Sequence, residues 1–353
     1  MKQWKARIYQ EGDETRIVDL MNMVFRHKND VRFWSWKYKT APRGFLSVVA
    51  EDHGKIVGHL GFQLLNVKVG NKIIIGSQAC DLCVNPDYRG QGIFVELLKI
   101  LSKKARNEKV FFTHSFPTDE ACYGYTKYGW FDVSKMSVLA TYYDTYRALE
   151  DNLKRLKGSK PVLRSAKYSD KFFSIWRRNA LKSVENIEIA QISRFDAEIE
   201  RVWNEVSKHY GIMAVKDCEY LNWRYFAKPS THYHVIVARI GGNIQGYAVL
   251  SKSKSKDGTR DIGYIVDILS ISKSALFGLV NAANAYLSKQ SVDSVRCWTQ
   301  QNQPEYQVLK KCGYLPCPPL RRRFIASIRS HELLQAYKEA GEWHVNAGDS
   351  DWV

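Results

Sequence analysis

Residues 81–98 read Asp81-Leu-Cys-Val-Asn-Pro-Asp-Tyr-Arg-Gly-Gln-Gly-Ile-Phe-Val-Glu-Leu-Leu98. A short apolar strand is followed by a turn with Gly90 and Gly92, and the turn opens directly into an amphipathic helix. Backbone N–H groups from Arg89 to Ile93 then point into the turn, where the helix N-terminus adds partial positive charge. Glycine also lets the backbone approach a ligand closely. We therefore predict that this turn binds a diphosphate without a metal ion.

The turn lacks the spacing of two common phosphate loops, the Walker loop and the dinucleotide fingerprint. It resembles motif A of the GNAT family of N-acetyltransferases, R/Q-x-x-G-x-G/A. Arg89, Gly92 and Phe94 stand at the fixed positions, and the family has glycine or alanine where this chain has Phe94. The alternative is a surface strand-turn-helix that binds no ligand.

Further along, Glu120-Ala-Cys-Tyr-Gly-Tyr-Thr-Lys-Tyr-Gly-Trp130 resembles motif B of the same family. The family pattern is Ala-x3-Tyr-x-Lys/Arg-x-Gly-aromatic. The resemblance implies that the Tyr125 hydroxyl lies beside a thioester sulfur and protonates the leaving thiolate, since a phenol has a pKa of about 10 and a thiol about 8.5. The alternative is a buried packing tyrosine. The matching residues are Ala121, Tyr125, Lys127, Gly129 and Trp130.

The resemblance implies acetyl-CoA as cosubstrate and direct transfer, with no metal and no covalent acyl-enzyme. The pantetheine arm would lie along the strand from Asp81 to Val84, where main-chain N–H groups polarise the thioester carbonyl. A neutral amine then attacks. The residues expected to bind the cosubstrate are Leu82, Cys83, Val84, Arg89, Gly90, Gln91, Gly92, Ile93 and Phe94.

Two residues are candidates for the base that accepts the amine proton. Asp81 lies in an apolar strand, where desolvation raises the pKa of a carboxyl group. His114 lies on the neighbouring predicted strand. Asp267 repeats Asp81 in the second half of the chain, which favours a structural role instead, such as a hydrogen bond to the helix that carries Trp36 or Trp223.

An internal repeat relates the two halves of the chain. Phe33-Trp-Ser-Trp-Lys-Tyr38 matches Tyr220-Leu-Asn-Trp-Arg-Tyr225, and Asp81 matches Asp267. The copies differ where the chemistry is predicted. The second has Ser270-Ile-Ser-Lys-Ser-Ala-Leu-Phe-Gly278 in place of the glycine turn, and Leu309 in place of Tyr125. We expect the second copy to be degenerate and non-catalytic.

The fold class expected from the resemblance is α/β (α+β), with two tandem GNAT-like domains. Each would be a mixed, mostly antiparallel twisted sheet flanked by helices. The helix after the glycine turn should bury Ile93, Phe94, Leu97, Leu98, Leu101 and Ala105. We expect a catalytic domain at 1–143 closed by a strand at 134–143, a helical connection at 144–186, the second domain at 187–330 and a tail at 331–353.

The tail ends in Gly348-Asp-Ser-Asp-Trp-Val353. In some enzymes with several GNAT copies the chain terminus enters the active site and its carboxylate acts as base. Because an aromatic residue stands here beside acidic groups, we expect the tail to pack near the active-site cleft of the first domain. A frayed terminus is the alternative.

Composition limits the class of protein. The chain has 353 residues, 45% of them apolar, which is enough for about two domains with hydrophobic cores. No run approaches the length of a membrane span, and the N-terminus lacks the apolar core of a secretory signal, so we expect a cytoplasmic protein without a membrane partner. Of seven cysteines, Cys80 and Cys83 form a C-x-x-C with no second pair, and we expect no metal site.

The formal net charge of +17 favours an anionic ligand. Basic clusters at 252–256 and 321–323 are explained most simply as solvated lysine and arginine faces, and no motif supports nucleic acid as a partner.

We therefore expect an acetyl-CoA-dependent N-acetyltransferase that acts on a primary amine, with an aminosugar or another small molecule favoured. One alternative is another acyltransferase, including a Fem-like aminoacyltransferase. A second is an acyl-CoA-binding module without catalysis. The sequence leaves the acceptor, the acyl length and a homo-oligomer open.

Overall fold

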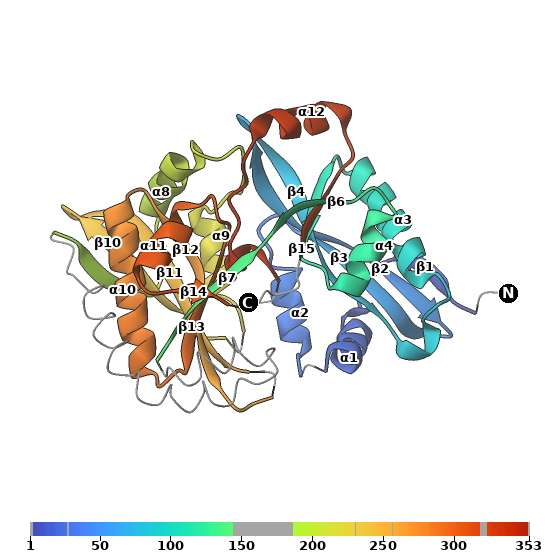
Figure 1. Cartoon of the computed structure of the whole chain (residues 1–353). Helices are drawn as coiled ribbons and strands as arrows, with labels where there is room; N and C mark the ends of the chain where they lie inside the picture. Colours follow the sequence, from blue (N-terminus) through green and yellow to red (C-terminus); the bar gives the residue numbers. More distant parts are fainter. Residues whose placement is uncertain are drawn as a thin grey trace, which may run out of the picture. The chain divides into compact units, whose positions relative to one another are not determined.

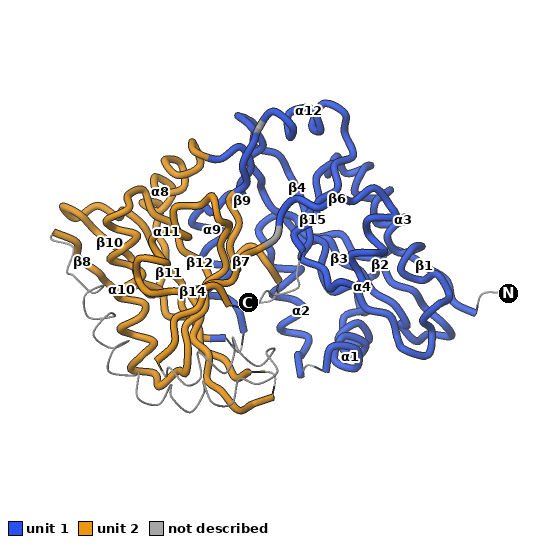
Figure 2. Tube along the Cα trace, in the orientation of Figure 1, with its two compact units in different colours: residues 1–134, 210–231, 323–343 blue, residues 135–209, 232–322, 344–353 orange. Residues whose placement is uncertain are grey.

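The computed structural model describes residues 3–26, 28–143, 186–229, 231–255, 257–317 and 323–351. Residues 144–185 of the predicted connection at 144–186 lie outside these ranges, as do Lys256, Arg321, Arg322 and the terminal Trp352 and Val353. The chain divides into two compact units (Figure 2). Unit 1 comprises 1–134, 210–231 and 323–343, and unit 2 comprises 135–209, 232–322 and 344–353.

Unit 1 is built on one mixed sheet with the order β1-β2-β3-β4-β5-β15-β6, and β9 pairs with β3 (Figure 1). Neighbours from β1 to β4 are antiparallel, β4 and β5 are parallel, and β5 and β15 are antiparallel. The strands are β1 (Lys5–Ile8), β2 (Phe45–Asp52), β3 (Lys55–Val69), β4 (Lys72–Val84), β5 (Phe112–Ser115), β6 (Phe131–Lys135), β9 (Ile212–Ala214) and β15 (Arg323–Ile328).

Side-chain caps fix the starts of two helices of unit 1. The Asp30 side chain accepts from the Phe33 N–H at the start of α2, and Thr118 accepts from Ala121 N–H at the start of α4. α3 buries the predicted apolar face, with Phe94 half-buried beside it. The elements are α1 (Glu14–Phe25), α2 (Val31–Lys37), the 3-10 turn η1 (Pro86–Tyr88), α3 (Ile93–Asn107), α4 (Asp119–Thr126), α9 (Cys218–Tyr225) and α12 (His331–Ala340).

The repeated tryptophans join α2 and α9 within unit 1. The Trp36 and Trp223 rings stack with centroids 5.3 Å apart and an interplanar angle of 19°. Each indole N–H donates to the backbone carbonyl of the other tryptophan, at 2.8 Å from Trp36 and 2.9 Å from Trp223. These reciprocal bonds give the helix pair a local two-fold arrangement, as the sequence repeat would produce.

Unit 2 has a second mixed sheet with the order β14-β7-β13-β12-β11-β10-β8. β12 and β13 are parallel and the other neighbours are antiparallel. Its elements are β7 (Ser137–Tyr142), β8 (Glu188–Ile192), α8 (Glu198–Ser207), β10 (His234–Ile240), β11 (Asn243–Lys254), β12 (Asp261–Ser270), α10 (Lys273–Lys289), β13 (Ser294–Thr299), α11 (Pro304–Lys311), β14 (Leu315–Pro316) and the 3-10 turn η3 (Ala347–Asp349). The predicted α/β class, with two GNAT-like domains of mixed sheets flanked by helices, is confirmed.

The units differ from the contiguous domains that the sequence predicted. The expected closing strand at 134–143 is split, and its second part, β7, pairs with β13 from Ser137↔Thr299 to Tyr142↔Ser294. Conversely, β15, which follows the second copy in the sequence, lies between β5 and β6 in the sheet of unit 1. Alternating side chains predict a strand but do not specify its neighbour, so the exchange could not be read from the pattern.

The tail is divided between the units: residues 331–343 belong to unit 1, and the described residues 344–351 belong to unit 2. The Asn346 side chain donates to Asp267 Oδ1 at 2.6 Å, and a capping box links Asn346 with Asp349. Residues 344–350 are buried.

In the part of the chain that the structure describes, we find no helix with the length and apolar character needed to cross a membrane.

Candidate active site

The glycine turn of unit 1 has the geometry that a bound diphosphate needs. Gly90 and Gly92 have φ of 76° and 81°, and a Cβ built on either one meets no atom within 4 Å. The turn therefore borders open space. α3 starts at Ile93 with Gly92 as N-cap and no side-chain cap, and its first backbone bond runs from Glu96 N–H to Gly92 O at 3.2 Å. The preceding N–H groups of the first turn are left for a ligand.

β4 is interrupted immediately before this turn. The register with β3 passes from Gly61↔Cys80 to His59↔Cys83, so Asp81 and Leu82 form a bulge, and Asp81 has a φ of 53°. On its other side, the register of β4 with β5 ends at Gln78↔His114. Beyond that pair, β4 has no neighbouring strand on the β5 side among the described residues. Its backbone groups there are placed to bind an extended ligand.

Tyr125 lies on α4 and is only 2% exposed. Its ring meets Phe94 edge-on with centroids 5.2 Å apart, and it lies 4.6 Å from the Trp130 ring centroid. Phe94 fits because residue 124 is glycine, since a Cβ there would overlap the Phe94 ring. The departure from the family motif at Phe94 is thus accommodated on α4, next to the predicted catalytic tyrosine.

Asp81 is held by α2. Its carboxylate accepts from Lys37 Nζ at 2.7 Å and from the Tyr38 hydroxyl at 2.6 Å, and Lys37 and Asp81 form a buried ion pair. Burial raises the pKa of the Asp81 carboxyl, but the Lys37 charge and the two hydrogen bonds outweigh burial and hold the pKa below its usual value. The prediction of a raised pKa for Asp81 is wrong. The structure instead shows the structural alternative, a hydrogen bond between Asp81 and the helix that carries Trp36.

His59 completes this cluster on the bulge. Its Nδ1–H donates to the Asp81 carbonyl at 3.0 Å, and Nε2 accepts from Ser47 Oγ at 3.0 Å. Burial lowers the pKa of the imidazole. Sequence reasoning missed both Lys37 and His59. A signal existed for Lys37, because each copy has a basic residue and a tyrosine after its repeated tryptophan.

His114 lies where β4 and β5 separate and is 5% exposed. It is surrounded by aromatic rings, with centroid distances of 6.1 Å to Phe112, 6.0 Å to Phe116 and 5.8 Å to Phe324. The buried side chain of Gln78 stands opposite it in the β4–β5 register. The structure therefore places His114 at the opening in the sheet and places Asp81 on the bulge of β4.

The equivalent positions in unit 2 have different chemistry. α10 is capped by Ser272, whose side chain accepts from Ala275 N–H at 3.2 Å, so a side chain satisfies a donor that α3 leaves to a ligand. Leu309, at the position of Tyr125, is fully buried in the apolar core. No group of three or more His, Cys, Asp or Glu side chains suited to a metal occurs among the described residues of the chain.

Comparisons with known proteins agree with this geometry. Residues 5–131 match the family model described as acetyltransferase (GNAT) domain. No curated protein matches. A probable N-acyltransferase from Enterococcus faecalis V583 is similar in structure, with a TM-score of 0.66 and 12% identity over 96% of this chain and 75% of the other.

Two further solved structures show the same fold. A GCN5-related N-acetyltransferase from Anabaena variabilis aligns with a TM-score of 0.62 and 12% identity over 93% of this chain and 73% of the other. N-myristoyltransferase from Saccharomyces cerevisiae, solved with bound myristoyl-CoA, aligns with a TM-score of 0.61 and 11% identity over 93% of this chain and 79% of the other.

Proposed function

We propose that this chain transfers an acetyl group from acetyl-CoA to a primary amine, because residues 5–131 match the model of a GNAT acetyltransferase domain. The observation that carries the proposal is the uncapped start of α3 behind Gly90 and Gly92, with open space beside both glycines. Such a start binds a diphosphate through backbone N–H groups and the helix dipole.

In the proposed mechanism, N–H groups of the β4 bulge near Leu82 polarise the thioester carbonyl. The amine nitrogen forms a bond to the carbonyl carbon, and the C–S bond breaks. The Tyr125 hydroxyl gives its proton to the departing sulfur, and the amine gives up one proton. The hydroxyl regains its proton from solvent before the next turnover.

His114 is the remaining candidate for the group that accepts the amine proton, because Asp81 is engaged by Lys37 and Tyr38. His114→Gln should lower kcat by about tenfold to a hundredfold and leave KM for acetyl-CoA within about twofold, since His114 lies on β5 and not on the glycine turn. Steady-state kinetics between pH 6 and pH 9 would measure this. If the variant has the kcat and the pH profile of the wild type, His114 is not the base, and water accepts the proton of the amine.

The differences at Ser272 and Leu309 support the proposal that unit 2 does not catalyse the transfer. A leucine cannot donate a proton to sulfur. The capping serine also occupies a backbone donor that stays uncapped at the start of α3.

We favour a small amine such as an aminosugar as the acceptor, by analogy with the family. The test is release of free CoA thiol when the full chain is incubated with acetyl-CoA and a panel of aminosugars, polyamines, aminoglycosides and amino-terminal peptides. Acetyl-CoA should support release with at least one class of amine. Myristoyl-CoA and intermediate chain lengths, tested in parallel, establish the acyl specificity. Tight binding of acetyl-CoA with no thiol release from any amine would contradict the enzyme and indicate a binding module.

Gly92→Ala tests the turn itself. The methyl group strains a residue at φ of 81° and projects into the space proposed for the diphosphate, so KM for acetyl-CoA should rise about tenfold or more. Gly54→Ala is the matched control, because Gly54 has φ of 79°, equally open surroundings and no proposed ligand. An equal effect of both substitutions, or none at Gly92, would contradict diphosphate binding at this turn.

A further inference from the structure

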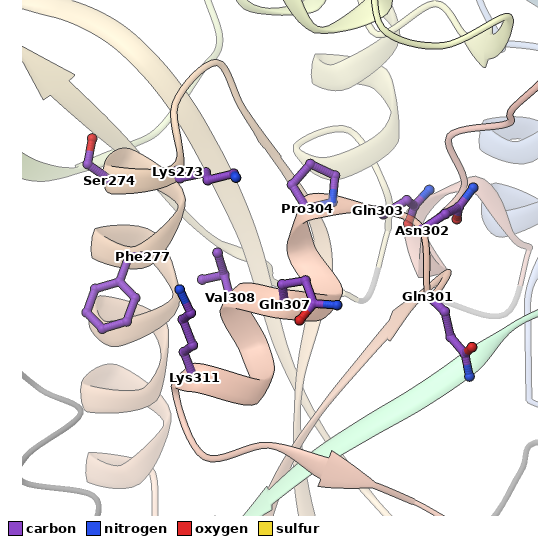
Figure 3. A pocket seen from close by; sticks show the side chains of 10 residues that line it. All are labelled: Lys273, Ser274, Phe277, Gln301, Asn302, Gln303, Pro304, Gln307, Val308 and Lys311. Atoms are coloured by element: carbon purple, nitrogen blue, oxygen red, sulfur yellow. The ribbon is translucent and has the colours of Figure 1, made fainter.

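Unit 2 contains a cavity of about 610 Å³ between the first turns of α10 and the length of α11 (Figure 3). Its volume lies within the range of sites that bind small molecules. The cavity is made by unit 2 alone, since its lining comes from residues 273–311. The proposed acetyl transfer in unit 1 leaves it without a role.

The cavity has a cationic lining. Lys273 and Lys311 extend into the space between the two helices (Figure 3), and no aspartate or glutamate lines the cavity. Within the described part of the chain, neither ammonium group has an ion-pair or hydrogen-bond partner. Two unpaired positive charges around one hollow favour a ligand with a multiply charged anionic group.

A buried amide holds one wall of the cavity in place. Gln303 is 1% exposed, and its Oε1 accepts from Thr299 Oγ1 at 2.9 Å and from Gln300 N–H at 3.0 Å. These two bonds fix the orientation of the amide. Its Nε2 is buried and has no hydrogen-bond partner among the described residues, although Gln303 lines the cavity.

The remaining walls suit a ligand with an aromatic or apolar part and hydroxyl groups. Phe277 presents a ring from α10, and Val308 lies beside it on α11 (Figure 3). Gln301, Asn302 and Gln307 add amides that can donate to and accept from sugar hydroxyls. α11 starts at Pro304 without a side-chain cap, which leaves the positive end of its dipole near the cavity.

The repeat relates this cavity to the glycine turn of unit 1. α10 follows the strand with Asp267 as α3 follows the strand with Asp81, and α11 precedes Gly313 as α4 precedes Gly129. The cavity therefore lies between the two helices that correspond to α3 and α4, at the start of α10 and along α11. In unit 2, Ser272 is the N-cap where α3 has Gly92, and Lys273 is the first helical residue where α3 has Ile93, so the two helix starts offer a ligand different groups.

We propose that this cavity of unit 2 binds a nucleoside diphosphate group, with Lys273 and Lys311 on the phosphates, Phe277 against the base and the amides on the sugar. The source is a free nucleotide, a nucleotide sugar or the nucleotide end of coenzyme A. The site is a binding site without chemistry, and it is independent of the transfer proposed for unit 1.

Calorimetry on the full chain tests the site with ADP, UDP, UDP-N-acetylglucosamine and coenzyme A as probes. Each titration is repeated with saturating acetyl-CoA to occupy the turn of unit 1. The double variant Lys273→Ala/Lys311→Ala removes the two charges, and Gln307→Glu places a carboxylate in the lining. The matched control is Lys289→Ala/Lys310→Ala, which removes two exposed lysines from the same helices outside the cavity. Thermal unfolding verifies that each variant is folded.

The expected result is saturable binding of at least one nucleoside diphosphate, weakened about tenfold or more by both cavity variants and unchanged in the control. If that binding persists under saturating acetyl-CoA, the ligand is a free nucleotide or a nucleotide sugar. If acetyl-CoA displaces the probe, and the cavity variants also weaken its binding, the ligand is the nucleotide end of coenzyme A. Absence of saturable binding, or binding that the cavity variants leave unchanged, would overturn the proposal. Thiol release is measured on the same proteins. If the chain shows no transferase activity but still shows the lysine-dependent binding, the result contradicts the transfer proposed for unit 1 and leaves the cavity proposal standing.

Discussion

Replacing Tyr125 by phenylalanine is expected to lower kcat for acetyl transfer by about a hundredfold or more, with acetyl-CoA affinity within about twofold of wild type. Phenylalanine keeps the ring contacts with Phe94 and Trp130, so α4 should stay in place. It lacks the hydroxyl that we propose as proton donor to the thiolate, a contribution that is typically 10²- to 10⁴-fold. Rapid-mixing or steady-state thiol release gives kcat, and calorimetry gives the affinity.

Tyr123→Phe is the matched control for this experiment. Tyr123 lies on the same helix but is 67% exposed, so its hydroxyl can be removed without touching the site. The control should keep full activity. An unchanged kcat in Tyr125→Phe would show that Tyr125 is a packing residue, the alternative that its burial also allows.

The second large effect is on stability, at the ion pair that joins α2 to the bulge of β4. Asp81→Asn should lower the free energy of unfolding by about 3–5 kcal/mol at pH 7, because it leaves the Lys37 ammonium buried without its counter-charge. Asparagine tolerates the φ of 53° at this position, so the substitution changes charge and little else. Urea unfolding measures the loss.

A double variant separates the charge from the packing. Lys37→Met/Asp81→Asn removes both charges, and it should recover most of the stability lost in Asp81→Asn, since replacing a whole buried pair is often neutral. Equal instability of the single and double variants would contradict a charge effect.

The same pair predicts a pH dependence. The carboxyl of Asp81 has a folded-state pKa below its usual value, so its contribution is fully present above the unfolded pKa of about 3.9 and is lost as pH falls towards the folded pKa. The gap between wild type and Asp81→Asn should therefore be constant from pH 7 to about pH 5 and shrink in more acidic solution. A gap that narrows instead towards alkaline pH would contradict this assignment.

Local patterns carried most of what the sequence could predict. The apolar face of α3 and the glycines of the turn follow from spacing and from the φ that glycine allows, and both are found as expected. The repeat showed that Trp36 and Trp223 occupy equivalent positions in the two copies. It could not show that the two residues touch, because no sequence pattern indicates that each indole N–H donates to the other's carbonyl.

The features that were missed depend on contacts between distant segments. Lys37 reaches Asp81 across 44 positions, and this contact reversed the expected direction of the Asp81 pKa. Phe94 departs from the family motif, and its ring is accommodated because Gly124, on another helix, has no side chain. Such compensations are invisible until both segments are placed in space.

The exchange of β7 and β15 has a consequence for any attempt to dissect the protein. A chain cut after residue 143 would lack β15, and the sheet of unit 1 would then present the unpaired edge of β5, with β6 deprived of its neighbour. The remaining half would lack β7, the strand between β14 and β13. Because open sheet edges recruit other chains and aggregate, we expect each fragment expressed alone to be prone to aggregation, and the two units to fold as one chain.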